Sequence, residues 1–322
     1  MKMDNDIIES FDYTNCLLCS STGKQLYKDM PDGLFGSKGR WTLSQCSNKQ
    51  CELIWLNPCP TQNDIYKAYH KYFFHGTQDR EECCTLHQWL LQIFHFIKLA
   101  SFSRLPLKYM FLAKVPPGRV LDIGCGNGRT LQLLKTKGWQ IIGQEVDPVS
   151  AAIAQKRLQC KIYTQKLPDI HFPDNSFDAV VMNHVIEHIH DPIDILKECR
   201  RILKPKGKLI SVTPNAKSIL HKIFQESWLG LDPPRHIHIF SVKNYKTLAE
   251  KAGFESIRYW TTMANAINCC WLSLEIKHKN PYPVERPTLQ NAIRAFFLKP
   301  FSALSLLLNK DSGDEIILIA EK

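Results

Sequence analysis

The sequence predicts an α/β fold with a mostly parallel β-sheet for residues 116–322. Short apolar segments typical of strands alternate there with segments whose apolar residues recur at helical spacing. A glycine-rich turn, Gly124-Cys125-Gly126-Asn127-Gly128, directly follows the first strand, and Glu145 ends the second. This combination indicates a nucleotide-like ligand beyond the carboxyl ends of the strands.

The elements follow a Pro116-Pro117-Gly118 interruption, where we place a domain boundary. We expect strands at 119–123, 140–145, 161–164, 177–183, 208–213, 255–260 and 315–320. We expect helices at 129–136, 150–158, 192–203, 242–252 and 291–308. Pro205 and Gly207 end the third helix before the fifth strand, and Gly253 ends the fourth helix.

Three parts follow from changes in composition along the chain. Residues 1–60 are rich in Cys, Gly and Asn and form a small module, and residues 61–115 form a helical connector or cap. Residues 116–322 form the α/β domain, with inserts at 214–240 and 262–312.

Composition restricts the class of protein. The 322 residues are 44% hydrophobic and 22% charged, which is typical of a folded globular chain. We expect a cytoplasmic protein, because the N-terminal residues include acids and lack the apolar core of a signal peptide. The net charge of +10 is spread thinly, whereas nucleic-acid binders concentrate it, so we expect no nucleic-acid partner.

The glycine turn is part of a longer series of motifs. VLDIGCGNG resembles motif I of the class I S-adenosylmethionine (SAM) methyltransferases, and the resemblance continues through GWQIIGQEVDP, FPDNSFDAVVMNHVIEHIHDP and LKPKGKLISVTPN. It covers about residues 118–260. It implies a Rossmann-like, seven-stranded sheet of order 3-2-1-4-5-7-6, whose last strand, EIILIA, is antiparallel.

The same resemblance implies a set of cofactor contacts. They are Asp122, Gly124, Cys125, Gly126, Glu145, Gln165 and Asn183. The glycine turn and Asp122 are expected at the methionine moiety, Glu145 at the ribose hydroxyls and Asn183 beside the cofactor. Gln165 stands near the position where many relatives carry an acid facing the adenine amine.

A first histidine group, in HVIEHIHDP, follows the fourth strand. If this segment is helical, His184, Glu187 and His188 share one face, at i, i+3 and i+4. That face is suited to a divalent cation or a general base. Ubiquinone-pathway O-methyltransferases, which this region resembles, bind a metal here, but their first residue is acidic and here it is His184. The alternative is that the group only caps a helix and braces the loop.

A second histidine group lies in the insert after the fifth strand. His236 and His238 alternate with apolar residues, so their rings can point to one side. Related deoxysugar C-methyltransferases place a histidine base in this region, and we expect His236, then His238, to remove a substrate proton. The alternative is a stiff structural loop.

Four cysteines near the N-terminus form the pattern C-x2-C, 26 residues, C-x4-C. Cys16, Cys19, Cys46 and Cys51 are therefore candidate ligands of a structural zinc ion, with Cys59 as a substitute for Cys51. The segment resembles zinc-binding modules that precede SAM methyltransferase domains. Unliganded buried cysteines and a redox role are the alternatives.

These observations predict a SAM-dependent methyltransferase that acts on oxygen or carbon of a small molecule, such as a sugar, a quinone precursor or a lipid-linked glycan. A catalytically silent SAM-binding scaffold and a nicotinamide-dependent oxidoreductase are the alternatives. The apolar segments 89–102 and 293–308 either pack on the catalytic domain or form a peripheral membrane contact.

Overall fold

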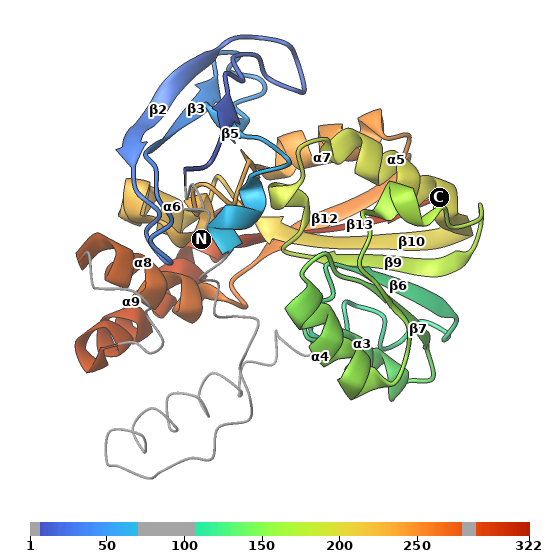
Figure 1. Cartoon of the computed structure of the whole chain (residues 1–322). Coiled ribbons are helices and arrows are strands. Elements are labelled where there is room, and N and C mark those ends of the chain that lie inside the picture. Colours follow the sequence, from blue (N-terminus) through green and yellow to red (C-terminus); the bar gives the residue numbers. More distant parts are fainter. Residues whose placement is uncertain (1–6, 70–106, 279–287) are drawn as a thin grey trace, which may run out of the picture.

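The computed structural model describes residues 7–69, 107–278 and 288–322 (Figure 1). A seven-stranded sheet with the order β12-β13-β10-β9-β6-β7-β8 forms its largest part. The strands are β6 (Arg119–Ile123), β7 (Gln140–Gln144), β8 (Ile162–Tyr163), β9 (Phe177–Asn183), β10 (Leu203–Pro214), β12 (Ser256–Thr262) and β13 (Glu315–Glu321). β13 runs antiparallel to β10 and β12, and the pairs on the other side of β10 are parallel. The predicted fold class and strand order are confirmed.

Helices cover both faces of this sheet, as a parallel sheet requires. The helices are α3 (Arg129–Lys135), α4 (Pro148–Leu158), α5 (Pro192–Ile202) and α7 (Val242–Lys251). Leu121 packs in the core with α5 and α7, whereas its neighbour Val120 packs in the core with α3 and α4. Successive strand side chains point to opposite faces, so one apolar strand contributes to two cores.

Two of these helices, α4 and α7, begin at side chains that satisfy their free N–H groups. Asp147 precedes α4 and accepts a hydrogen bond from the Ser150 backbone at 2.6 Å, and Pro148 takes the first helical position. Ser241 and Asn244 form a reciprocal capping box at the start of α7. These local signals explain why the expected helix boundaries lie within two residues of the observed ones.

The N-terminal segment folds as a second sheet that uses a distant strand. The four-stranded sheet has the order β11-β4-β3-β2. Its strands are β2 (Gly23–Met30), β3 (Trp41–Cys46), β4 (Ile54–Leu56) and β11 (His238–Ile239). A further short pair joins β1 (Ser10–Phe11) and β5 (Cys59–Pro60). Because β11 belongs to the 214–240 insert, the N-terminal module and the α/β domain share this sheet.

The inserts contain more regular structure than the sequence predicts. The first contains α6 (Ile219–Phe224) as well as β11, and the second contains α8 (Ala266–His278) and α9 (Leu289–Leu308). The sequence analysis did not predict α8, because the apolar residues of this helix lie on all its sides and give no one-sided pattern. Most of the expected connector, including segment 89–102, lies outside the described residues.

A third core joins the N-terminal sheet to these inserts. Trp41 and Leu43 of β3 pack there with Trp228, with Leu220 of α6 and with Cys270 of α8. Among the described residues, no helix is both long and apolar enough to cross a membrane.

Candidate functional site

A cavity of about 230 Å³ lies at the carboxyl end of β6, above the glycine turn. It is lined by Asp122, Gly124, Cys125, Gly126, Asn127, Arg129, Thr130 and Asn183. Five of the seven predicted cofactor residues are in this lining. The chain folds this way because β6 is buried and the turn leads directly into α3, so residues of the turn and the first two residues of α3 line the cavity.

Glycine is required in this turn for two different reasons. Gly124 has a φ of 64°, and a Cβ there would lie 2.6 Å from Cγ2 of Val185. Gly126 has a φ of 54°, but a Cβ there would meet no atom within 4 Å. Packing thus excludes a side chain at Gly124, whereas Gly126 leaves free space beside the cavity for a ligand.

Two acids lie at or beside the cavity, Asp122 in its lining and Glu145 next to the glycine turn. Glu145 Oε2 accepts a hydrogen bond from the Gly126 backbone at 2.8 Å and lies at the end of β7. Burial, followed by the charge of Glu145, raises the pKa of Asp122 to about 8. A ligand with positive charge would stabilise both carboxylates, and SAM carries an ammonium and a sulfonium. The donor set therefore fits this cofactor.

Gln165 stands two residues after the end of β8. Its side chain is exposed, and its backbone carbonyl accepts from Gln144 Nε2 at 2.9 Å. Gln144 is nearly buried, and its Oε1 accepts from the Gly124 backbone at 3.3 Å. Gln144 thus connects the segment after β8 to the glycine turn. Gln165 takes part in this connection through its backbone carbonyl.

His184 directly follows β9 and forms two ion pairs. Its Nδ1 donates to Glu187 at 3.2 Å and its Nε2 to Glu315 at 2.9 Å. Burial disfavours the charged ring, but these two carboxylates raise the pKa of His184 to about 10. Because both ring nitrogens carry protons at neutral pH, His184 does not fit the role of general base that the sequence suggested.

The helix that was to align His184, Glu187 and His188 is not formed. His184 has a φ of 56°, and only a 3₁₀ turn, η4 (Ile186–His188), follows it. Instead, Glu187, His188 and His236 each offer one potential ligand atom, all within 4.8 Å of one another. The structure therefore replaces His184 by His236 in the candidate cation group.

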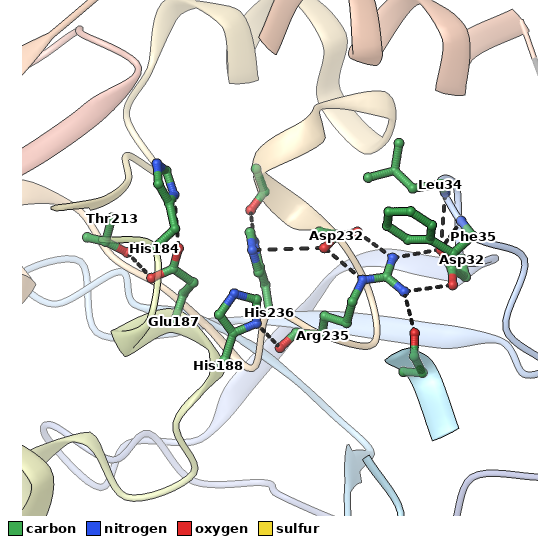
Figure 2. A network of polar contacts seen from close by, with 12 residues as sticks. Asp32, Leu34, Phe35, His184, Glu187, His188, Thr213, Asp232, Arg235 and His236 are labelled. Atoms are coloured by element: carbon green, nitrogen blue, oxygen red, sulfur yellow. Dashed lines mark hydrogen bonds and ion pairs between the residues drawn. The ribbon is translucent and has the colours of Figure 1, made fainter. Parts of the chain in front are cut away.

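The tautomers of the two histidines in this group are fixed by backbone carbonyls. His188 Nδ1 faces the Arg235 carbonyl at 3.0 Å, and His236 Nδ1 faces the Gly230 carbonyl at 2.9 Å (Figure 2). A carbonyl only accepts, so each Nδ1 carries the proton and each Nε2 presents a lone pair when the ring is neutral. The ring centroids lie 4.7 Å apart. Burial, then His236, lowers the pKa of His188 to about 4.

Glu187 is the charged member of the group. Its side chain is buried, yet the hydrogen bond from His184 lowers the pKa of this carboxyl to about 2. Its Oε2 also accepts from the Thr213 hydroxyl at 2.9 Å, and Thr213 lies near the end of β10. The group thus lies at the carboxyl edge of β9 and β10, on the edge where ligands bind in such sheets.

Arg235 fixes the loop that carries His236 (Figure 2). Its fully buried guanidinium donates to Asp232 at 2.6 and 2.9 Å and to Asp32 at 2.7 and 2.8 Å. Asp32, in the loop after β2, also accepts from the backbones of Leu34 and Phe35 at 3.0 Å. Burial opposes its ionisation, but Arg235 lowers the pKa of Asp32 to about 2.

His238 is fully buried and does not reach the group. Its Nδ1 lies 3.2 Å from the Ile189 carbonyl, and its ring packs edge-on against Tyr13. Burial lowers the pKa of His238 to about 3, so the ring is neutral. A fully enclosed ring has no route to a substrate, so the second catalytic candidate has a structural position.

The four predicted cysteines converge. Cys16 and Cys51 have their sulfurs 3.6 Å apart, Cys19 and Cys46 3.4 Å apart, and all four lie within 4.8 Å of one another. Thiolates bound ~2.3 Å from a tetrahedral zinc ion lie about 3.8 Å apart. The donor set therefore fits zinc. Cys59, the substitute candidate, is buried elsewhere beside Pro60.

A family model for a methyltransferase domain matches residues 92–259, just over half of the chain. The chain belongs to this methyltransferase family. A probable S-adenosylmethionine-dependent methyltransferase of Mycolicibacterium smegmatis is 33% identical over 156 residues, which are 48% of this chain and 59% of that protein. A ubiquinone biosynthesis O-methyltransferase of Cereibacter sphaeroides is 27% identical over 164 residues, 48% of this chain and 66% of that protein.

This chain thus spans no more than 66% of the length of either relative. A SAM-dependent methyltransferase structure from Thermotoga maritima has a TM-score of 0.47 at 23% identity, covering 73% of this chain and 93% of that chain. The family match confirms the predicted methyltransferase family.

Three features of the site were missed by the sequence analysis. Arg129 and Thr130 line the cofactor cavity from the start of α3, where the residues after a glycine turn could have been included. His236 joins Glu187 across 49 positions of sequence, without any signal in spacing. Asp32 pairs with Arg235 across 203 positions, and no sequence pattern indicated this pair.

Proposed function

We propose that the protein transfers the methyl group of SAM to an oxygen or carbon atom of a small molecule, with His236 as the general base. SAM would supply a methyl group that its sulfonium already makes electrophilic. The chain must then orient the acceptor beside the cavity and take up its proton. The observation that carries this proposal is the pairing of His236 with Glu187 and His188 at the carboxyl edge of β9 and β10.

His236 is favoured over the other histidines by its hydrogen bonds. Its Nδ1 proton is held by Gly230, so Nε2 is the atom that accepts a proton. His184 already carries two protons, and His238 is enclosed. The nearby carboxylate of Glu187 would stabilise the imidazolium that forms when His236 accepts a proton.

The acceptor class rests on weaker support. The ubiquinone-pathway relative is named as an O-methyltransferase, which favours a hydroxyl acceptor of a quinone precursor. The cysteine module resembles those of sugar methyltransferases, which favours a sugar or a lipid-linked glycan. We therefore propose these three classes as the substrates to screen.

The first experiment supplies labelled SAM with a catechol, a nucleotide sugar or a lipid-linked glycan. His236→Gln should lower turnover by about a hundredfold or more, as expected for loss of a general base, and leave the affinity for S-adenosylhomocysteine unchanged. His171→Asn, at an exposed left-handed position, is the matched control. Near-normal turnover of His236→Gln would overturn the assignment. Binding without transfer to any of the three acceptors would favour the silent scaffold.

A divalent cation held by Glu187, His188 and His236 is a second candidate role for the same group. Two Nδ1–H groups bonded to carbonyls and one ionised carboxylate form the arrangement that metal-binding histidines use. Turnover that a chelator abolishes and Mg²⁺ or Zn²⁺ restores would support the cation. Turnover unchanged by a chelator would exclude the cation and leave the general base as the only proposed role of this group.

We further propose that Cys16, Cys19, Cys46 and Cys51 hold a structural zinc ion. Cys46 is the last residue of β3 and Cys51 lies between β3 and β4, so the ion would fix the sheet that carries Asp32 and receives β11. Metal analysis should give about one zinc per chain, and Cys46→Ser should lose it. Cys160→Ser, a cysteine outside the cluster, should retain it. Metal-free wild-type protein that is fully folded would contradict the proposal.

A further inference from the structure

Within the part of the chain that the structure describes, α9 presents an uncovered apolar face. Seven of its large apolar side chains are between 37% and 81% exposed. They are Ile293, Phe296, Phe297, Phe301, Leu304, Leu307 and Leu308. Their spacing of three, one, four, three, three and one places them on a single face of the helix. Figure 1 shows α8 and α9 at one end of the molecule, away from α3 and α4.

The opposite face of α9 contacts the protein, and it combines small or polar side chains with Leu298, which packs against the third core. Asn291, Ala295 and Ser302 are buried. Asn291 Nδ2 donates to Glu275 of α8 at 2.8 Å, and Ser305 donates to Ser312 at 2.9 Å. A surface helix of a globular protein normally buries its apolar face. α9 instead buries mainly small and polar side chains and leaves its larger apolar ones uncovered by the residues that the structure describes, so this exposed side favours an apolar partner.

The charges around this face identify the partner. Residues 288–310 contain no Asp or Glu but contain Arg294, Lys299 and Lys310. The Arg294 and Lys310 side chains are exposed. Two copies of the chain packed through this face would bring these cations together without an acid in the segment to pair with them. An anionic lipid surface satisfies both features, since it offers negative head groups above an apolar layer.

We propose that α9 docks the protein on an anionic lipid bilayer. The helix lies along the surface, with its seven apolar side chains in the acyl boundary and the exposed Arg294 and Lys310 at the head groups. Its 20 residues span about 30 Å. This inference does not depend on the proposed methyl transfer, because it rests on the surface of α9 alone.

The test is flotation of the full chain with vesicles of phosphatidylcholine and phosphatidylglycerol in equal parts, and with pure phosphatidylcholine. The wild type should float with the anionic vesicles and bind them more weakly at high salt. Leu307→Ser combined with Leu308→Ser should lower binding by about tenfold or more, because both side chains leave water on docking. Val149→Ser, an exposed apolar position on α4, should bind like the wild type.

The double variant alters two side chains that are each 81% exposed, so the fold should not depend on them. Its affinity for S-adenosylhomocysteine verifies this and separates a docking defect from a catalytic one. Absence of wild-type flotation, or equal flotation of the double variant, would overturn the proposal. A dimer in sedimentation that the double variant dissociates, without lipid binding, would show instead that a second copy covers this face.

Discussion

Replacing Asp32 with Asn tests whether the buried ion network joins the N-terminal sheet to the catalytic loop. The change removes the charge that receives two donors of Arg235, at 2.7 and 2.8 Å, while keeping the size of the side chain. Arg235 keeps Asp232 and the Ala68 carbonyl as acceptors. The NH₂ group of the new Asn side chain then faces the N–H donors of Arg235 and cannot accept from them. The variant therefore loses both the charge and hydrogen bonds.

The expected loss can be worked from the ionisation of Asp32. Its pKa falls from 3.8 to about 2 in the folded protein, and the side chain is fully buried, so solvent does not screen the pair. A shift of that size corresponds to about 2 kcal/mol. Removing one partner of a buried pair costs about 3–5 kcal/mol, and we expect about 2–3 kcal/mol here because Asp232 remains.

The sign of the pH dependence follows from the lowered pKa. Asp32 is more acidic when folded, so its contribution is complete above the ordinary carboxyl range and is lost as pH falls from about 4 towards 2. The stability difference between wild type and Asp32→Asn should therefore shrink by about 1 kcal/mol by pH 3.

Urea unfolding, followed by circular dichroism at neutral pH and at about pH 3, measures both effects. Asp174→Asn is the matched control, because Asp174 pairs with Arg201 but is 67% exposed, and such pairs contribute about 0–1 kcal/mol. A loss below about 1 kcal/mol for Asp32→Asn, or an equal loss for Asp174→Asn, would refute the reasoning. Because Arg235 precedes His236, the variant should also lower turnover more than it lowers S-adenosylhomocysteine affinity.

Three further predictions concern the cofactor cavity and the charged histidine. Gly126→Ala should weaken S-adenosylhomocysteine binding in calorimetry by about tenfold or more, since its methyl group enters the free space of the cavity. Gly138→Ala, also at positive φ and without a close contact, should lose about 1–2 kcal/mol of stability but no affinity. Glu145→Ala should weaken the same binding, and unchanged affinity would show that the acid does not contact the ligand. His184, with its pKa raised to about 10, stabilises the fold at neutral pH and loses this contribution as pH rises through about 10. In an NMR titration its ring should remain protonated beyond pH 8, and Glu315→Gln should lower its pKa; a wild-type ring that titrates near 6.5 would contradict the paired geometry.

The seven-stranded sheet was predictable because its signals are local. Strand β9 begins at Phe177 and ends at Asn183, as expected, because apolar residues are bounded there by polar turns. The glycine turn was also predictable from local sequence, since Gly124 and Gly126 need backbone angles that other residues rarely adopt. The cysteine spacing likewise sufficed to predict a cluster.

The histidine site was predictable only in part, because it is assembled from segments that are far apart in the sequence. The residue types and the two segments were identified, but the partners were not. A left-handed backbone at His184 turns its ring towards Glu315, and the insert brings His236 to Glu187 instead. Neither event has a signature in spacing, because each depends on how the loop packs.

The sequence by itself determined the strands and the cofactor turn, since short-range periodicity and residue-specific backbone angles encode them, and its ordered motifs gave the resemblance that implied the family and the strand order. Only the tertiary structure decided that β11 of the insert completes the N-terminal sheet and that Arg235 joins Asp32 to Asp232. Only the structure also decided that α9 turns its apolar face outward. Helical periodicity gives the existence of an apolar face, but which face is buried depends on the neighbour that the fold provides, here the polar contact with α8.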